Sequence, residues 1–208
     1  LPGNVSSQFI TGLLYALPLL EGDSEIVLTT PLESEGYVNM TLDALARFGV
    51  RADRREQGWH VPGGQTYVPR DAAVESDYSQ AAFYYAARLL GSPVEIQGLN
   101  PDSAQGDAVI LEYCKRLSGP GAVTLDVSQC PDLVPPLAAA AALRAGETTR
   151  IVGAARLRIK ESDRLDTVAT QLNALGARVE QGADSLAIRG VSALTGGTVS
   201  GCNDHRIA

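Results

Sequence analysis

Helical and extended patterns of apolar residues alternate along the chain, which is typical of an α/β protein. The first helix is predicted between the polar segment 6–8 and Gly22, where apolar residues recur at helical spacing. The residues of this stripe are Phe9, Leu13, Leu17 and Leu20. A strand is predicted next, over residues 25–30.

A pattern of helix, glycine and two strands occurs twice. Residues 42–51 and residues 172–178 share a leucine spacing and a glycine stop, and a strand that contains arginine follows each. Gly49 stands where glycine tolerates a left-handed backbone, and residues 50–56 and 58–62 then predict a hairpin. We interpret the pattern as an internal repeat, with a chance likeness between α/β segments as the alternative. A degenerate middle copy with a shortened hairpin is predicted over residues 110–117 and 122–127.

A domain crossing is predicted near Asp77, which follows a strand end and caps an alanine-rich helix running to Leu90. We therefore divide the chain into residues 1–75, the last part of one domain, and residues 76–208, most of a second. The other predicted helices begin with polar or charged residues, where the helix dipole and free N–H groups favour anions. These helices cover residues 104–117, 132–143 and 162–175.

Composition narrows the classes of function. The chain has 24 acidic and 17 basic residues, so its net charge of -7 disfavours nucleic acid as a partner and requires local basic groups to capture an anion. The apolar runs 13–20 and 137–143 are far shorter than the roughly 20 residues of a membrane span. The odd cysteine count, with no Cys-x-x-Cys pair, favours reduced thiols and a cytoplasmic location.

Both ends of the chain suggest that residues are missing. The first residue is Leu1 rather than methionine, and no signal-peptide pattern accounts for a processed start. Residues 203–208 place helix-capping residues before a predicted helix that stops within its first turns. We expect the chain to be an internal piece of a longer protein.

Basic residues concentrate between residues 156 and 164. If this stretch is extended, Arg156, Arg158 and Lys160 share one strand face and could meet a phosphate or carboxylate together. Glu161 and Arg164 follow at the start of the next helix, where a carboxylate beside cations can carry a proton. The alternative is a solvated charged turn capped by a serine, which charge alone favours.

Three motifs in the same order resemble those of the EPSP synthase family, the 3-phosphoshikimate 1-carboxyvinyltransferases. Residues 160–165 read K-E-S-D-R-L, like the family signature. Residues 3–9 resemble its G-x-V-S-S-Q-F segment, and residues 203–206 resemble its N-D-H-R segment. Weaker counterparts lie at residues 34–37, 105–107 and 131–132, so the resemblance covers essentially the whole chain.

The resemblance implies a transferase of aromatic amino-acid biosynthesis. Such enzymes move the enolpyruvyl group of phosphoenolpyruvate to the 5-hydroxyl of shikimate 3-phosphate and release phosphate, by addition and elimination through a tetrahedral intermediate. They need no metal or organic cofactor. Their fold is built from repeated βαβαββ units in two domains, which close over the small-molecule substrates. A monomer is expected.

The resemblance also implies roles for individual residues. Binding of shikimate 3-phosphate is implied for Ser6, Ser7, Gln8, Ser34, Asp132 and Lys160. Binding of phosphoenolpyruvate is implied for Gln8, Arg164 and Arg206. Asp132 would act as the base, and Glu161 would deliver a proton to the phosphoenolpyruvate methylene. Supporting roles are implied for Asp204, His205 and Arg156.

Some of these residues also have a purely structural explanation. Ser6 and Ser7 could simply cap a helix, and Asp132 could be an ordinary cap behind Pro131. His60, in a predicted hairpin, is expected to be structural. Two other functions also remain open: an enolpyruvyl transferase acting on UDP-N-acetylglucosamine, and a noncatalytic anion-binding module.

Departures from the family pattern matter for activity. Residues 34–37 read S-E-G-Y where the family often has S-K-P-Y, so an anion replaces a cation, and Arg156 stands where some members have asparagine. An N-terminal lysine, a glycine-containing loop and an arginine of the first domain, and a late C-terminal lysine have no counterpart here. We therefore expect these 208 residues to be inactive on their own.

Overall fold

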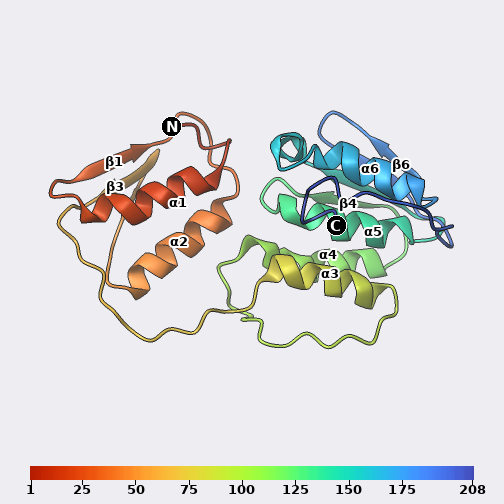
Figure 1. Cartoon of the computed structure of the whole chain (residues 1–208), viewed down its shortest axis with the longest axis horizontal. Coiled ribbons are helices and arrows are strands. Elements are labelled where there is room, and N and C mark those ends of the chain that lie inside the picture. The colour runs from red at the N-terminus through yellow and green to blue at the C-terminus, as the bar shows by residue number, and fades with distance from the viewer. The chain divides into compact units, whose positions relative to one another are not determined.

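The computed structural model describes residues 1–208, which form two compact units (Figure 1). The first unit comprises Leu1–Glu75 together with Asn100–Gly106, and the second comprises Ser76–Leu99 and Asp107–Ala208. The division made from the sequence falls at the first of these boundaries. The sequence pattern does not indicate the return of residues 100–106 to the first unit.

The first unit is a small sheet covered by two helices. Its sheet has the order β1-β3-β2, with β3 antiparallel to both neighbours. Helices α1 and α2 pack against each other, and their buried residues join those of the sheet in one core (Figure 1). The elements are α1 (Ser7–Ala16), the short 3-10 helix η1 (Leu17–Leu19), β1 (Ser24–Val27), α2 (Glu35–Arg47), β2 (Asp53–Arg55) and β3 (Gly58–Val61).

The buried face of α1 differs from the predicted stripe. Ile10 and Leu14 are fully buried, whereas Phe9 is 63% exposed and Leu13 is 36% exposed. Apolar residues cover a wide arc of this helix, so two stripes one residue apart both have helical spacing, and packing against the sheet and α2 selects the Ile10 stripe. The prediction of a helix was right, but of the predicted stripe only Leu17 packs against the core.

The second unit contains a mixed four-stranded sheet. Its order is β4-β5-β7-β6, with β4 parallel to β5 and the other neighbours antiparallel. Helix α5 contacts α3, α4 and α6 as well as β5 and β7, and four of its five alanines are buried (Figure 1). The strands are β4 (Val123–Asp126), β5 (Thr148–Val152), β6 (Val179–Gln181) and β7 (Leu186–Arg189). The helices are α3 (Tyr78–Leu89), α4 (Ile110–Ser118), α5 (Val134–Ala142) and α6 (Arg164–Ala174).

Three 3-10 helices lie in the second unit or, for the first residue of η2, at its boundary. They are η2 (Gly106–Val109), which precedes α4, η3 (Pro131–Leu133), which precedes α5, and η4 (Ala155–Ile159), which follows β5. None of the helices combines the length and the apolar character that a bilayer crossing would need.

The run β4–α5–β5–α6–β6–β7 is a complete βαβαββ unit, and the first unit repeats its order from the first helix onward. The sheet order β1-β3-β2 matches β5-β7-β6, and the glycines that end α2 and α6 both adopt a positive φ, 79° at Gly49 and 94° at Gly176. The expected α/β fold and its repeated helix, glycine, strand and strand are confirmed. In the middle copy, α4 leads to β4 without a hairpin, since β4 is the first strand of the next unit.

Residues 156–160 are not extended, so the predicted strand face of Arg156, Arg158 and Lys160 does not exist. Ala155–Ile159 is instead the 3-10 helix η4, in which the Leu157 side chain is fully buried. Arg158 turns away to donate to the carbonyl oxygens of Gly182 and Ala183 and to the Asp163 carboxylate. Arg158 is therefore committed to these partners, whereas Arg156 stays close enough to Lys160 to lower its pKa.

Candidate active site

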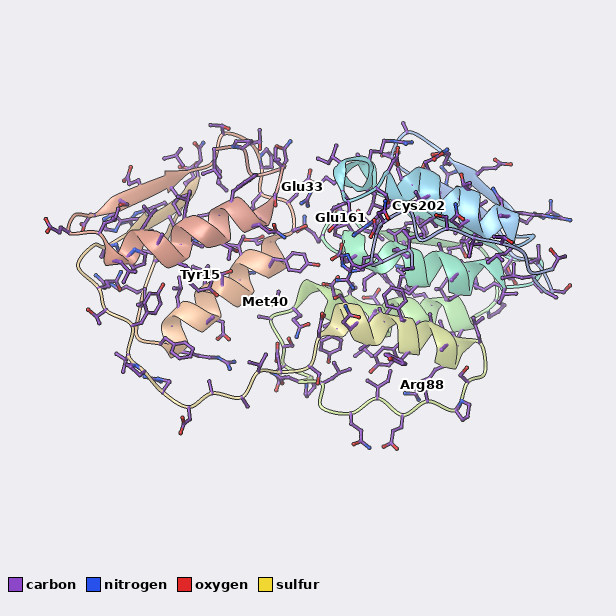
Figure 2. All side chains as sticks on the ribbon, viewed as in Figure 1. Tyr15, Glu33, Met40, Arg88, Glu161 and Cys202 are labelled. Carbon is purple, nitrogen blue, oxygen red and sulfur yellow. The ribbon has the colours of Figure 1, made fainter.

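The second unit gathers polar and charged side chains from four separate segments. They come from the first turn of α3, from η3, from residues 161–164 at the start of α6, and from the turn after Asn203. Glu161 belongs to the loop before α6, and Cys202 belongs to the segment that leads into the last turn (Figure 2). Most of the residues predicted from K-E-S-D-R and N-D-H-R therefore lie in one cluster.

Arg164 is the centre of this cluster and is 1% exposed. Its Nε and Nη2 donate to the two oxygens of Asp204 at 2.7 and 3.0 Å. Nη1 donates to Asp132 at 2.8 Å, and Nη2 also donates to Glu161 at 2.7 Å. Burial alone disfavours the charged guanidinium, but the hydrogen bond with Asp204 and the surrounding carboxylates outweigh it and raise the pKa of Arg164.

Asp204 is buried and has three kinds of donor around it. Besides Arg164, the Ser162 hydroxyl donates to Oδ2 at 2.8 Å and the Arg206 backbone N–H donates to Oδ1 at 3.0 Å. Burial by itself raises the pKa of a carboxyl, but these donors lower the pKa of Asp204 to about 2. The Asp204 carbonyl also accepts from the Ala208 backbone N–H at 3.1 Å, which closes a turn over residues 204–208.

Asp132 lies between two guanidinium groups. Its Oδ1 accepts from Arg164 and its Oδ2 accepts from Nη2 of Arg206 at 3.2 Å. The side chain does not cap a helix, since Cys130 and Leu133 are the N-cap residues of η3 and α5. The ordinary-cap interpretation of Asp132 is therefore wrong, and its carboxylate is turned to the cluster.

Arg206 is almost fully buried but only partly paired. Its Nη2 donates to the Ser79 hydroxyl at 2.9 Å and to Asp132. Its Nε and Nη1 are buried and have no hydrogen-bond partner. A buried guanidinium with unused N–H groups is costly, and an anion with two acceptor oxygens, such as a carboxylate or phosphate, satisfies such groups well.

Lys160 and Glu161 flank the cluster. Burial lowers the pKa of Lys160, with Arg156 and Arg164 acting in the same direction and Asp132 and Glu161 opposing them. The Glu161 side chain is 50% exposed although it pairs with Arg164. A half-exposed carboxylate beside a half-buried ammonium group is suited to exchanging protons with a ligand or with solvent.

The remaining predicted residues of the second unit are peripheral to the cluster. His205 is exposed, with its Nδ1 at 4.0 Å from the Asp204 carboxylate. Arg156 lies partly buried in η4. Ser162 does not cap α6, because Asp163 does so by accepting from the Asp166 backbone N–H. The serine-capped turn is therefore not what the structure forms.

In the first unit, the predicted residues lie at the starts of α1 and α2. Ser6 is the N-cap of α1 and accepts from the Gln8 N–H at 3.3 Å, while Ser7 is buried in the first turn. Ser34 is buried before α2 with a φ of 55°. The Glu33 N–H donates to the Gly3 carbonyl, which brings the two helix starts to the same end of this unit.

Capping accounts for Ser6 but not for Ser7, which lies inside the helix. Two helix N-termini at one end of the unit offer backbone N–H groups and favourable dipoles to an anion. The ligand roles of these serines and of Gln8 stay predictions.

Sequence reasoning missed Ser79 and the second function of Asp77. Asp77 was predicted as a cap, and it does accept from the Ser79 backbone N–H, but it also accepts from the Ser79 hydroxyl. Ser79 contacts Arg206 across 127 residues of sequence, and no local pattern signals such a contact. No group of histidine, cysteine and acidic side chains in the chain could hold a metal ion, and the cluster carboxylates converge on Arg164.

Comparison with known proteins places the chain in a family. The model of the family EPSP synthase (3-phosphoshikimate 1-carboxyvinyltransferase) matches residues 1–208. The 3-phosphoshikimate 1-carboxyvinyltransferase of Clostridium acetobutylicum is 49% identical over 100% of this chain and 52% of its own length. The enzyme of that name from Clostridioides difficile is 46% identical over 99% of this chain and 51% of its own length.

Solved structures show the same fold. An EPSP synthase from Acinetobacter baumannii superposes with a TM-score of 0.76 at 24% identity, over 97% of this chain and 52% of that one. The chain thus spans about half the length of the relatives that it matches. By its family match, its motifs and its repeated units, the chain belongs to the EPSP synthase family.

Proposed function

We propose that this chain supplies part of an enzyme that transfers the enolpyruvyl group of phosphoenolpyruvate to the 5-hydroxyl of shikimate 3-phosphate. Family membership and the two curated relatives support the reaction, since both carry the name 3-phosphoshikimate 1-carboxyvinyltransferase. The observation that carries the proposal is the buried, partly unpaired guanidinium of Arg206 beside Asp132. A cytoplasmic location and a monomeric state belong to the same proposal.

Anion capture is assigned to Arg206 and Lys160 in the second unit. Arg206 has N–H groups available for the carboxylate or phosphate of phosphoenolpyruvate, and Lys160 offers an ammonium group for shikimate 3-phosphate. In the first unit, the helix starts that carry Ser6, Ser7, Gln8 and Ser34 are assigned to shikimate 3-phosphate, with Gln8 also contacting phosphoenolpyruvate. Asp204, His205 and Arg156 have supporting roles.

Arg164 requires a refinement of its proposed role. Each of its three nitrogens already donates to a carboxylate, so a direct bond to phosphoenolpyruvate requires one carboxylate to give way. Glu161 is the candidate, because it is half exposed whereas Asp204 is fully buried. Until then, Arg164 holds Asp132 and Glu161 at fixed positions in the cluster.

The two carboxylates are assigned opposite proton transfers. Asp132 accepts the proton of the 5-hydroxyl as that oxygen bonds to C2 of phosphoenolpyruvate, and Glu161 gives a proton to the methylene carbon. In the elimination step the bond from C2 to the phosphate oxygen breaks, the methyl group returns a proton to Glu161, and phosphate leaves with the proton that Asp132 had taken. Positioned acids and bases of this kind contribute about 100-fold or more each to a rate.

The first experiment uses the longest polypeptide that contains this chain. It measures the release of phosphate from phosphoenolpyruvate in the presence of shikimate 3-phosphate. We expect turnover, and we expect Asp132→Asn to lower kcat by about 100-fold. Asp126→Asn is the matched control, since the Asp126 side chain accepts from the Ser128 backbone N–H, whereas the ion pairs of Arg164 and Arg206 are with Asp132, Glu161 and Asp204. Equal loss in both variants would contradict the role of Asp132.

The second experiment uses the 208-residue chain alone, titrated with shikimate 3-phosphate and then supplied with phosphoenolpyruvate. We expect no phosphate release, because several charged residues of the family pattern have no counterpart in it. Tight binding without turnover by the longest polypeptide would favour the noncatalytic module. Transfer to UDP-N-acetylglucosamine would favour the related enzyme, which the names of the relatives do not support.

A further inference from the structure

The Ser79 hydroxyl forms a bridge between Asp77 and Arg206. Ser79 lies in the first turn of α3 and is 3% exposed. Its hydroxyl donates to Oδ1 of Asp77 at 2.7 Å and accepts from Nη2 of Arg206 at 2.9 Å. None of the motifs found in the sequence contains Ser79.

Asp77 determines the direction in which Ser79 acts. A serine hydroxyl has a single proton and two acceptor lone pairs. Because the Ser79 hydroxyl donates its hydrogen to the Asp77 carboxylate, its lone pairs are left to accept from the guanidinium of Arg206. The chain of hydrogen bonds therefore runs from a cation through a hydroxyl to a carboxylate, which makes each bond charge-assisted.

Arg206 is consequently held through one side-chain nitrogen, and its other two side-chain nitrogens are without a partner. Ser79 and Asp132 both accept from Nη2, and the Asp204 carboxylate fixes the Arg206 backbone N–H. The buried Nε and Nη1 have no partner. The contacts at Nη2 fix the plane of the guanidinium and so the direction of its unused N–H groups.

We infer that Ser79, oriented by Asp77, is a positioning residue that aims the unused N–H groups of Arg206 at a carboxylate or phosphate of the substrate. The inference rests on the proposed function, in which Arg206 binds phosphoenolpyruvate. A group displaced by about 1 Å can cost a large factor in rate, so a buried support for a binding arginine has a functional consequence.

Helix capping does not explain the Ser79 hydroxyl. Asp77 caps α3 through the Ser79 backbone N–H at 2.7 Å, a bond that alanine at position 79 also makes. Ser79→Ala therefore removes the support of Arg206 and leaves the cap intact. Asp77→Asn keeps a capping side chain but loses the carboxylate that directs the hydroxyl, so its effect should be in the same direction and smaller.

The kinetic test uses the longest polypeptide that contains this chain. We expect Ser79→Ala to raise KM for phosphoenolpyruvate by about 10-fold, as for loss of one hydrogen bond to a charged group, and to leave KM for shikimate 3-phosphate within about 2-fold. The matched control is Thr149→Ala, which removes a buried hydroxyl that accepts from Nη1 of Arg144 at 2.8 Å elsewhere in this unit. The control should leave both KM values unchanged. Equal effects of the two variants would overturn the inference.

A second measurement does not depend on turnover. The rotation of the Arg206 guanidinium about its Nε–Cζ bond can be followed by NMR of side-chain nitrogens, and Ser79→Ala should accelerate it by about 10-fold. If the unaltered protein shows no turnover but the guanidinium rotates faster in Ser79→Ala, the proposed function is contradicted. The support of Arg206 by Ser79 then still holds. Unaltered rotation overturns the inference, whatever the activity.

Discussion

The Arg164 guanidinium donates to both oxygens of the Asp204 carboxylate, at 2.7 Å through Nε and at 3.0 Å through Nη2. Both side chains are essentially inaccessible to solvent. The pair joins the K-E-S-D-R segment to the N-D-H-R segment, so two motifs that are far apart in the sequence share one buried ion pair.

Breaking this pair should strongly destabilise the second unit. Asp204→Asn leaves the buried Arg164 without its bidentate partner, and we expect a loss of about 3 kcal/mol in the free energy of unfolding. Urea unfolding measures the change. Glu112→Gln is the control, because the Arg116–Glu112 pair of this unit is exposed at 3.9 Å, and its loss should be within about 0.5 kcal/mol. Similar losses would mean that burial of the pair is unimportant.

Acid should weaken the same pair in a defined pH window. The folded pKa of Asp204 is about 2, below its ordinary value of 3.8. A lowered pKa gives stability that is fully present above pH 3.8 and is lost as the pH falls through 2, amounting to about 2 kcal/mol. Unfolding measured between pH 5 and pH 2 should therefore show a steeper loss in the unaltered chain than in Asp204→Asn. Parallel curves would contradict the assignment.

Glycine substitutions should have opposite effects at two positions of the first unit. Gly49 has a φ of 79°, and a Cβ there would lie 3.0 Å from Cγ2 of Val68, so Gly49→Ala should cost about 1 to 2 kcal/mol. Gly12 lies inside α1 with open space where the methyl group of an alanine would extend, so Gly12→Ala should stabilise by up to about 1 kcal/mol. Thermal unfolding compares the two, and a stabilising Gly49→Ala would refute the helix-end argument.

Glu75 should hold the return segment 100–106 in place. Its carboxylate accepts from the side chains of Asn100, Ser103 and Gln105, and the Gln105 and Ser103 hydrogen bonds lower its pKa. Glu75→Gln replaces an acceptor oxygen with a donor, so amides in this segment should exchange hydrogen faster. The amides of β3 serve as the internal reference. Unchanged exchange over residues 100–106 would show that the segment is held by other contacts.

Local patterns were sufficient for much of the fold. Gly49 and the Asp77 cap were predicted because a helix end depends on a few neighbouring residues. The buried face of α1 and the course of residues 156–160 were not, because the sheet beneath α1 and the burial of Leu157 decide them. Periodicity reports which residues are apolar, and tertiary packing selects among the stripes that they offer.

The candidate site divides in the same way. The K-E-S-D-R and N-D-H-R segments could be identified from their amino-acid sequence. The contact that they form between Arg164 and Asp204 depends on the fold. Ser79 has no motif, and its contact with Arg206 spans 127 residues. A hydroxyl whose importance comes from such a distant partner gives no signal in a single sequence.

The repeated helix, glycine and hairpin bear on how the chain folds. In each unit a strand, a helix and the following hairpin come from one uninterrupted stretch, Ser24–Val61 in the first and Thr148–Arg189 in the second. Within each stretch the hairpin joins near neighbours in sequence, whereas the first strand pairs with the last, Ser24 with Val61 and Thr148 with Arg189. The hairpin is therefore expected to form before the pairing across the helix, because closing a longer loop costs more entropy. The contact between Ser79 and Arg206 spans the longest loop and is expected to form last.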